Sequence, residues 1–378
     1  MSENNTKEHV TKHVAKPKIS VYIVVFGVIA AIIAVAAVST FAFNKNLSPK
    51  AVSLSSLKNY GPAPNFKGIS AWINSPPLNM SQLRGKVVLV DFWTYSCINC
   101  IRTIPFLNAL QKEYGSNGLV IVGVHTPEFQ FEHNLTNVQD AVKRFNITYP
   151  VALDNNYSTW DAYNNQYWPA DYLVDKNGDV RYLSFGEGPN AFNQTAAVVR
   201  ELLENANYTV PYNNIDVTDA LNFSQEVSPE MYLGFQELQN GRTDYFGDAQ
   251  SLLPEAVYNY TATNVSALNQ IYLAGEWYSA PDSIIAVNGS ELLLTYRARS
   301  VNIVASGNGT NSSITVILDG HNLNQSYLGS DVHLVNGTAV VNVSSSRLYS
   351  IVSAPSYGTH ILVITASKNF RLYTFTFG

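Results

Sequence analysis

The chain contains two cysteines, and only two residues separate them. Cys97 and Cys100 follow an apolar run of strand type and stand where a helical pattern begins. Two cysteines at this spacing can close a disulfide ring with little movement of the backbone. The dipole and the unpaired N–H groups of a helix start favour an anion, so we expect the pKa of Cys97 to fall below about 8.5. Cys100, one turn further along, can then attack the sulfur of Cys97 and resolve a mixed disulfide.

Two other roles are open to the same cysteine pair. A metal site is one alternative, although two cysteines supply fewer than the four ligands of a structural zinc centre. A structural disulfide is the other, although so small a ring constrains little of the chain. The strand–CxxC–helix context favours thiol–disulfide exchange over both. It therefore predicts a redox-active disulfide that needs no cofactor and no metal.

The elements that would position the pair alternate between strands and helices. Strands are predicted at 86–93, 119–126, 149–154, 171–175 and 180–186. Helical patterns run from the cysteines to Tyr114, before the stop at Gly115, and over 137–145. This alternation predicts an α/β domain over residues 62–206.

The motif DFWTYSCINC (91–100) resembles the thioredoxin superfamily, and longer segments resemble its TlpA/ResA/DipZ-like branch. These segments are YSCINCIRTIPFL (95–107), GVHTPEFQFEH (123–133), YPVALDN (149–155), YWPADYLVD (167–175) and FGEGPN (185–190). The resemblance implies a thioredoxin-like fold and thiol–disulfide exchange with protein thiols and disulfides. Ile98-Asn99 replaces the Gly-Pro of thioredoxin between the cysteines, which leaves the direction of electron flow open.

The resemblance also implies roles for residues outside the pair. Asp91 matches the buried carboxylate that exchanges a proton with the inner cysteine; the alternative is an Asp that caps a strand end. Trp168-Pro169 matches the cis-proline that faces the cysteines and helps to hold an extended substrate. Glu128 either contacts the substrate site or is a solvated loop carboxylate.

Three further residues of these motifs are candidates for the surroundings of the site. His125 lies near the end of the strand predicted at 119–126 and Glu187 follows the strand predicted at 180–186; for His125 we favour a structural role. Trp93 is expected to pack beside the site rather than to take part in the chemistry.

An apolar segment precedes the predicted α/β domain. Residues 21–43 contain no charge, Pro, Asn or Gln, and as a helix they would extend roughly 34 Å, enough to cross a hydrocarbon core of about 30 Å. We expect an uncleaved signal anchor, with a cleaved signal peptide as the alternative. Lysines lie within residues 1–20, so the positive-inside rule places this tail in the cytoplasm and the rest of the chain outside the cell membrane, as a single-pass protein.

Composition agrees with an external location. Sixteen Asn-x-Ser/Thr sequons follow residue 45, about threefold more than chance, which favours a glycoprotein over a surface merely rich in these residues. Charged residues supply only 13% of the chain and the net charge is −5, which argues against a nucleic-acid binder.

The last part of the chain changes character. Residues 44–61 and 207–227 are expected to be linkers, and 228–378 contains β-rich runs separated by turn formers at intervals near ten residues. This pattern predicts an all-β sandwich, jelly-roll-like in type. SPEMYLGFQ (228–236) and LAGEWYSAPDSIIA (273–286) resemble the DipZ-like C-terminal region, which is similar to carbohydrate-binding modules. Trp277 and Tyr278 are either a glycan platform or, as we favour, aromatic core and rim residues.

The leading hypothesis is therefore a membrane-anchored, extracytoplasmic thiol–disulfide oxidoreductase. DipZ-like proteins often carry a multi-helix electron-transfer region, and here a single predicted helix stands in its place. A reductase would then need a separate membrane electron donor of the CcdA type. The alternatives are a copper chaperone that uses both cysteines and His125, and a cell-surface carbohydrate- or protein-binding protein in which the β domain supplies the function.

Overall fold

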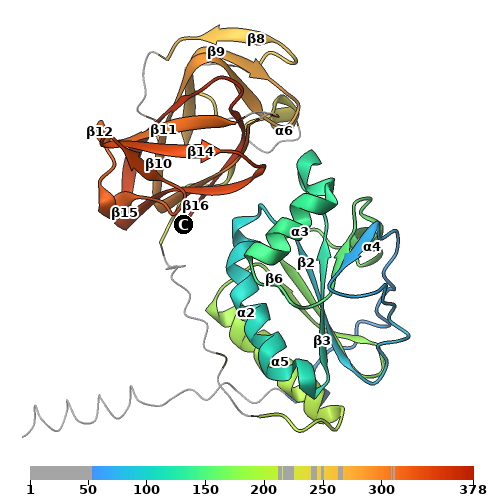
Figure 1. The fold of residues 1–378 in the computed structure, drawn as a ribbon. Helices are drawn as coiled ribbons and strands as arrows, with labels where there is room; N and C mark the ends of the chain where they lie inside the picture. The colour runs from blue at the N-terminus through green and yellow to red at the C-terminus, as the bar shows by residue number, and fades with distance from the viewer. Residues whose placement is uncertain are drawn as a thin grey trace, which may run out of the picture. The chain divides into compact units, whose positions relative to one another are not determined.

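The computed structural model describes residues 53–211, 215, 225–239, 245–247, 251–262, 267–307, 309 and 311–378. The tail and the transmembrane helix expected from the sequence lie outside the described residues, as do residues 44–52 of the first predicted linker and residues 212–214 and 216–224 of the second. Within the described ranges, no helix is long and apolar enough to cross a membrane. Residues 52–378 form one compact unit, which contains two separate sheets (Figure 1).

The first sheet is mixed and has six strands in the order β1-β4-β3-β2-β5-β6. Strands β2, β3 and β4 are parallel, while β1, β5 and β6 join them by antiparallel pairing. The strands are β1 (Ala71–Ile73), β2 (Val87–Trp93), β3 (Leu119–His125), β4 (Val151–Leu153), β5 (Ala170–Val174) and β6 (Val180–Phe185). This sheet confirms the strands predicted between residues 86 and 186.

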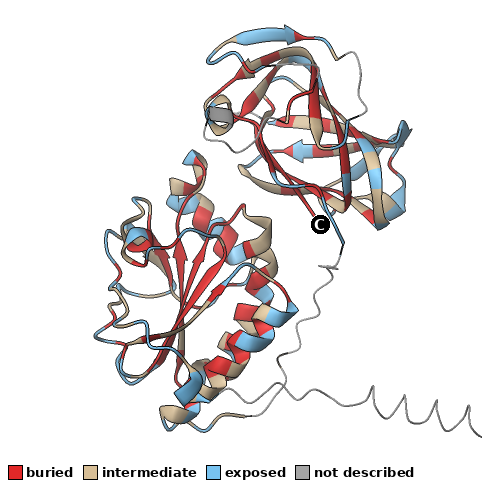
Figure 2. Ribbon diagram, turned by 180° about the vertical axis from the view of Figure 1, so that it is seen from behind, coloured by how far each residue is buried: buried red, intermediate tan, exposed pale blue. Residues whose placement is uncertain are grey.

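Both faces of this sheet are covered, which explains the unbroken apolar run of its central strand. All seven residues of β2 are buried, and the central strands are red along their length in Figure 2. Leu89 and Trp93 face a core shared with α2 (Ile98–Tyr114), α3 (Leu135–Arg144) and α5 (Pro189–Asn205). Val90 and Phe92 face a second core that includes Trp160 of the short helix α4 (Ser158–Ala162). Helices α2 and α3 were predicted, whereas α4 and α5 were not.

The second sheet has ten strands, and its paired strands are antiparallel. It consists of β7 (Met231–Tyr232), β8 (Val257–Tyr260), β9 (Gln270–Ser279), β10 (Ile284–Ser306), β11 (Ser312–Leu318), β12 (His321–Asn322), β13 (His333–Val335), β14 (Thr338–Val343), β15 (Arg347–Ala366) and β16 (Arg371–Phe377). A short helix, α6 (Phe235–Gln239), lies between β7 and β8 in the chain. The all-β prediction for this part of the chain is confirmed at the level of an antiparallel sheet.

The expected interruption of this sheet by turns about every ten residues was wrong for its two longest strands. The β-rich runs 291–298 and 301–306 both belong to β10, and the runs 347–353 and 360–366 both belong to β15. The two long strands pair with each other, and their register shifts between Ala298 and Ser300 and again between Val301 and Asn302. A β-bulge accommodates extra residues by bending a strand. Residues that resembled turn formers therefore bend these strands instead of ending them.

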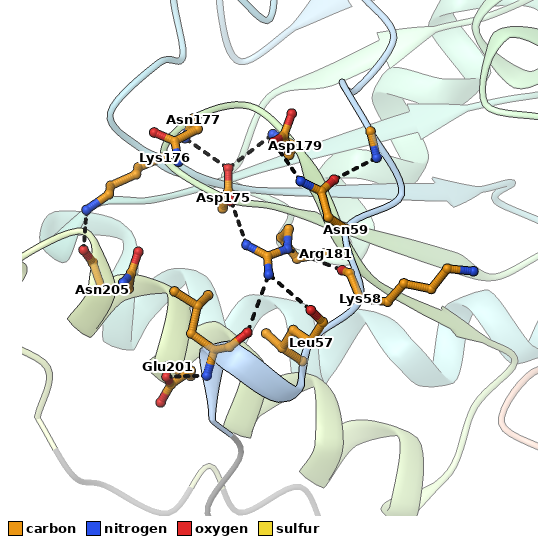
Figure 3. Close-up of polar contacts among 12 residues, drawn as sticks. Leu57, Lys58, Asn59, Asp175, Lys176, Asn177, Asp179, Arg181, Glu201 and Asn205 are labelled. Carbon is orange, nitrogen blue, oxygen red and sulfur yellow. Dashed lines mark hydrogen bonds and ion pairs between the residues drawn. The ribbon is translucent and has the colours of Figure 1, made fainter.

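A partly buried ion pair joins the segment before β1 to the β5–β6 hairpin (Figure 3). Arg181 Nη1 lies 3.0 Å from Asp175 Oδ2, and Nη2 donates to the carbonyls of Leu54 and Leu57. The other oxygen of Asp175 accepts hydrogen bonds from the backbone N–H groups of Asn177 and Asp179. Every oxygen of this carboxylate therefore has a partner.

Candidate functional site

The two cysteines lie at the start of α2, directly beyond the end of β2. Cys97 caps the helix, and its Sγ accepts a hydrogen bond of 3.2 Å from the backbone N–H of Cys100. The two sulfur atoms lie 2.6 Å apart in the free-thiol form. Cys97 is half-buried, whereas Cys100 is 1% exposed. The outer sulfur can thus be reached by another molecule and the inner one only by Cys97.

The expectation of a lowered pKa for Cys97 was wrong for this reduced form. Burial raises the pKa of the Cys97 thiol, and the hydrogen bonds from the side chain and backbone N–H of Cys100 offset only part of that effect. The negative charges of Glu230 and Glu128 raise it further. Burial also raises the pKa of Cys100, more strongly, and Asp91 adds to that rise. A base near Cys100 is therefore needed to produce its thiolate at neutral pH.

Asp91 occupies the position of such a base. It lies on β2 with 1% exposure and on the same face as Leu89 and Trp93, which pack in the core that contains Cys100. Burial, with the neighbouring carboxyl of Asp171, raises the pKa of Asp91 well above its usual range. A buried carboxyl with a raised pKa can exchange a proton with a neighbouring thiol. Asp171 was not predicted as a site residue, since it is the first residue of the strand predicted at 171–175 and meets Asp91 only through the pairing of β2 with β5.

The peptide bond between Trp168 and Pro169 is cis, directly before β5. Trp168 lines a pocket of about 240 Å³ together with Cys97, Ile98 and Asn99. Glu128 lies on the same pocket, and its Oε1 accepts a hydrogen bond of 2.7 Å from Tyr232 Oη. The remaining lining residues come from the ends of the C-terminal sheet region: Val227, Ser228, Glu230, Tyr232, Thr376 and Phe377. The structure therefore gathers Cys97, Trp168 and Glu128 around one pocket.

A second buried carboxylate, Glu132, holds the loop that leads into the cysteines. Its Oε1 accepts hydrogen bonds from the N–H and the hydroxyl of Ser96, at 3.2 and 2.6 Å. Its Oε2 accepts from the backbone N–H groups of Glu128 and Phe129. One side chain thus ties the residue before Cys97 to the loop that carries Glu128. Glu132 was not predicted, since nothing in the segment FQFEH distinguishes it from a surface residue.

The other residues predicted near the site, His125, Trp93 and Glu187, are packed in the core or held in an ion pair. His125 is fully buried between Trp93 and Tyr95, and burial lowers its pKa to about 3. Its imidazole is therefore neutral at physiological pH, in agreement with the structural role that we favoured. Trp93 is 1% exposed and packs in the core beside Cys100, as expected. Glu187 forms an ion pair of 3.1 Å with Arg102 of α2.

Two further predictions concern bound ligands. In the part of the chain that is described, no three His, Cys, Asp or Glu side chains form a group able to hold a metal ion. The copper alternative, which requires both cysteines and His125, has no such cluster there. Trp277 is 1% exposed, and its Nε1 donates to the carbonyls of Ala274 and Glu291. It is a core residue, as favoured, and its ring face is not open to a sugar.

Comparison with known proteins relates both parts of the chain to characterised families. A family model described as Redoxin matches residues 42–199, and one described as Thioredoxin like C-terminal domain matches residues 228–378. Protein DipZ of Mycobacterium bovis is 36% identical over 344 residues, which cover 89% of this chain and 45% of that protein. The chain thus spans less than half the length of this relative.

Shorter relatives match the part of the chain that holds the cysteines. Thiol-disulfide oxidoreductase YkuV of Bacillus subtilis is 30% identical over 125 residues, which cover 33% of this chain and 84% of that protein. Thiol-disulfide oxidoreductase ResA of Geobacillus kaustophilus is 33% identical over 107 residues, with coverages of 28% and 59%.

Proposed function

Since the chain belongs to the thiol–disulfide oxidoreductases of the thioredoxin superfamily, we propose that it exchanges disulfides with protein substrates outside the cell membrane to which it is anchored. The observation that carries the chemistry is the unequal exposure of two adjacent sulfur atoms. Cys97 is half-buried and lines a pocket, while Cys100 is buried behind it, 2.6 Å away. The accessible sulfur attacks, and the hidden sulfur resolves.

The exchange proceeds in two displacements on sulfur. The Cys97 thiolate attacks a substrate disulfide, which forms a mixed disulfide and releases one substrate sulfur as a thiolate. Cys100 then gives its proton to Asp91 and attacks Cys97 Sγ, and the second substrate sulfur leaves. Two electrons pass from the enzyme dithiol to the substrate, and the enzyme retains the Cys97–Cys100 disulfide. The reverse sequence oxidises a substrate dithiol.

The pocket around Cys97 is suited to an extended segment of a substrate. We assign Trp168 and Pro169 to one wall of this site and Glu128 to the other, because Trp168 and Glu128 line the pocket on which Cys97 opens. Backbone groups beside the cis-proline would pair with the substrate backbone, as β-strand addition does in other peptide-binding proteins.

A trapping experiment tests this mechanism. In a Cys100→Ser variant the mixed disulfide cannot be resolved, so Cys97 should stay bound to its substrates. We expect disulfide-linked proteins to co-purify with this variant and to be released by dithiothreitol. The double variant Cys97→Ser/Cys100→Ser is the matched control and should capture none. Equal capture by both variants, or none by either, would contradict the proposed exchange.

The anchored, extracytoplasmic location is supported by three features of the sequence: the apolar segment 21–43, the lysines before it and the sixteen sequons after it. A membrane-impermeant maleimide should label Cys97 in intact, pre-reduced cells, and a glycosidase should lower the apparent mass of the protein. Labelling only after lysis would place the site inside. If the enzyme works as a reductase, we propose that a CcdA-type membrane protein supplies its electrons.

The direction of electron flow follows from the potential of the Cys97–Cys100 couple. A midpoint of about −270 mV in a redox titration, as in thioredoxin, would indicate a reductase, and one of about −120 mV, as in DsbA, an oxidant. Capture of CcdA-type partners by the trapping variant is expected only in the first case.

A further inference from the structure

Two aspartates lie side by side in the middle of the first sheet. Asp91 of β2 and Asp171 of β5 are direct partners in the antiparallel pairing of these strands. Side chains on directly paired residues point to the same face, with Cβ atoms about 4.5–5.5 Å apart. Leu89 and Leu173, two positions away on each strand, both pack in the core that contains Cys100. The two carboxyls therefore face each other on the side of the sheet where the inner cysteine lies.

Neither carboxyl has a cationic partner among the described residues. Asp91 is 1% exposed and Asp171 is 7% exposed, and one oxygen of each is buried without a hydrogen-bond partner. The described ion pairs of the first sheet and its helices involve Asp175 and Glu187 instead. Two buried carboxylates this close cannot both be charged without a large electrostatic penalty. The pair must hold at least one proton, which one carboxyl donates to the other.

Electrostatics support a shared proton. Burial raises the pKa of both groups, for Asp171 to about 7, and the charge of Asp171 further raises that of Asp91. The titratable groups that act on the pair from neighbouring elements are Cys100 of α2, Tyr149 before β4 and Tyr182 of β6. None of these is a cation, so none of them stabilises a negative charge on the pair. Because burial disfavours charge, the pair can also bind a second proton and become neutral.

Asp171 also connects Asp91 with the edge of the sheet. On its other side Asp171 pairs with Ser184 of β6, which is the terminal strand of this sheet. Ser184 is 8% exposed, and Tyr182 on the same face of β6 donates a hydrogen bond to Gln194 of α5. Polar side chains thus run from Asp91 through Asp171 to the last strand, across an otherwise apolar layer.

We propose that Asp171 is a second proton-transfer residue of the exchange reaction, and that Asp91 and Asp171 act as one base with a shared proton. This rests on the function proposed above and adds a residue to it. In the resolving step the singly protonated pair takes the proton of the Cys100 thiol. The Cys100 sulfur bonds to Cys97 Sγ, and the substrate sulfur leaves with the electron pair of the mixed disulfide. The neutral pair then returns one proton to solvent through Asp171, beside Ser184.

The rate of the resolving step tests this proposal directly. The reduced full chain is mixed with excess dithiobis-nitrobenzoate, which releases one coloured thiolate when Cys97 attacks and a second when Cys100 resolves. The second release is intramolecular, so its rate does not depend on reagent concentration. We expect Asp171→Asn to slow it about tenfold at pH 7, a part of the about 10²–10⁴-fold that a positioned base can supply.

The pH profile separates proton sharing from a merely structural role. Without Asp171, Asp91 loses a raising influence on its pKa, so the midpoint of the second-phase profile should move to lower pH. The infrared carbonyl band of a protonated carboxyl, present at pH 7 in the unaltered protein, should weaken. A purely structural change would slow the reaction without moving either quantity. An unchanged rate, midpoint and carbonyl band in Asp171→Asn would overturn the proposal.

Two further variants make the outcome specific. Asp175→Asn removes another buried carboxylate of the same hairpin and should leave the second-phase profile unchanged. A double-mutant cycle is completed by Asp91→Asn and by the double variant Asp91→Asn/Asp171→Asn. If the two carboxyls act as a unit, the double variant should lose less of the second-phase rate than the two single losses together. If only Asp91→Asn slows the second phase, Asp171 has no part and the proposed function stands. If neither single variant slows it, the role of Asp91 fails as well.

Discussion

Two aspartates four positions apart, Asp171 and Asp175, have opposite surroundings. Asp175 is 5% exposed, and its carboxylate pairs with Arg181 and accepts two backbone hydrogen bonds (Figure 3). Asp171 is 7% exposed, faces another carboxyl and keeps one oxygen without a partner. Burial alone therefore does not distinguish an acid that stabilises the fold from an acid that exchanges protons. The groups that contact each carboxyl make this distinction.

The difference has an energetic meaning. A buried carboxylate with a cation and backbone donors stays charged and holds its neighbours in place, and removing one partner strands the other. A buried carboxyl that faces its own kind must bind a proton, and that arrangement lowers the stability of the fold. Natural proteins retain such sites where a reaction uses them. The β5–β6 hairpin thus combines an anchoring acid with an acid that can exchange protons.

The largest expected effect comes from breaking the structural side of this comparison. Arg181→Ala leaves Asp175 buried without its cation and removes the bonds to the carbonyls of Leu54 and Leu57. We expect the free energy of unfolding to fall by about 3 kcal/mol, measured by urea denaturation. The double variant Arg181→Ala/Asp175→Asn should recover part of that loss. A loss below about 1 kcal/mol would mean that the ion pair between Arg181 and Asp175 contributes little to the stability of the fold.

The two aspartates should respond to the same substitution with opposite signs. Asp175→Asn loses charge-assisted hydrogen bonds and should destabilise the protein by about 2 kcal/mol. Asp171→Asn removes a buried, cation-free carboxyl and should stabilise it at pH 7 by roughly 1 kcal/mol. Urea denaturation of both variants beside the unaltered protein measures this directly. Destabilisation by both substitutions would mean that Asp171, like Asp175, is a structural acid.

The pH dependence of stability should come from the carboxyl pair. Because burial raises the pKa of Asp91 and Asp171, the folded protein binds more protons than the unfolded chain between about pH 4 and pH 7. The pair's contribution to stability is therefore full below the ordinary aspartate pKa and is lost as the pH rises through about 7. Urea midpoints of the unaltered protein and of Asp171→Asn, measured at pH 5 and at pH 7.5, test this. The midpoint of the unaltered protein, relative to that of the variant, should be lower at pH 7.5 than at pH 5. A difference that is constant or grows with pH would contradict the raised pKa values.

The predictable part of the site depended on short stretches of sequence. The CxxC pair, the buried strand before it and the helix after it are neighbours in the chain, so spacing and periodicity were sufficient. The resemblance added Asp91 and the cis peptide before Pro169, which the structure contains. Trp277 was correctly expected in the core, since large aromatic residues in β-rich runs usually pack there.

The unpredicted part depends on tertiary contacts between distant segments. Asp171 meets Asp91 only through the register of β2 and β5, and Glu132 meets Ser96 only because two loops converge. The pKa of Cys97 was mispredicted for a related reason: the helix start is a local feature, whereas burial comes from the surrounding fold. The two long strands were divided because a bulge and a turn use similar residues.

The smallest expected effect concerns Glu128, which acts on a cysteine through its charge. Glu128 lies on the pocket of Cys97 and raises the pKa of that thiol, although burial is the larger cause. Glu128→Gln keeps an oxygen for Tyr232 but removes the charge, so the pH midpoint of Cys97 alkylation by iodoacetamide should fall by a few tenths of a pH unit. Half-buried Cys97 should react before buried Cys100. The rate of its alkylation is therefore measured by mass spectrometry as the rate at which singly alkylated protein forms. Glu291→Gln, in the C-terminal sheet, should leave the midpoint in place. An unchanged midpoint, or a midpoint that moves to higher pH, would contradict the influence of the Glu128 charge on the pKa of the Cys97 thiol.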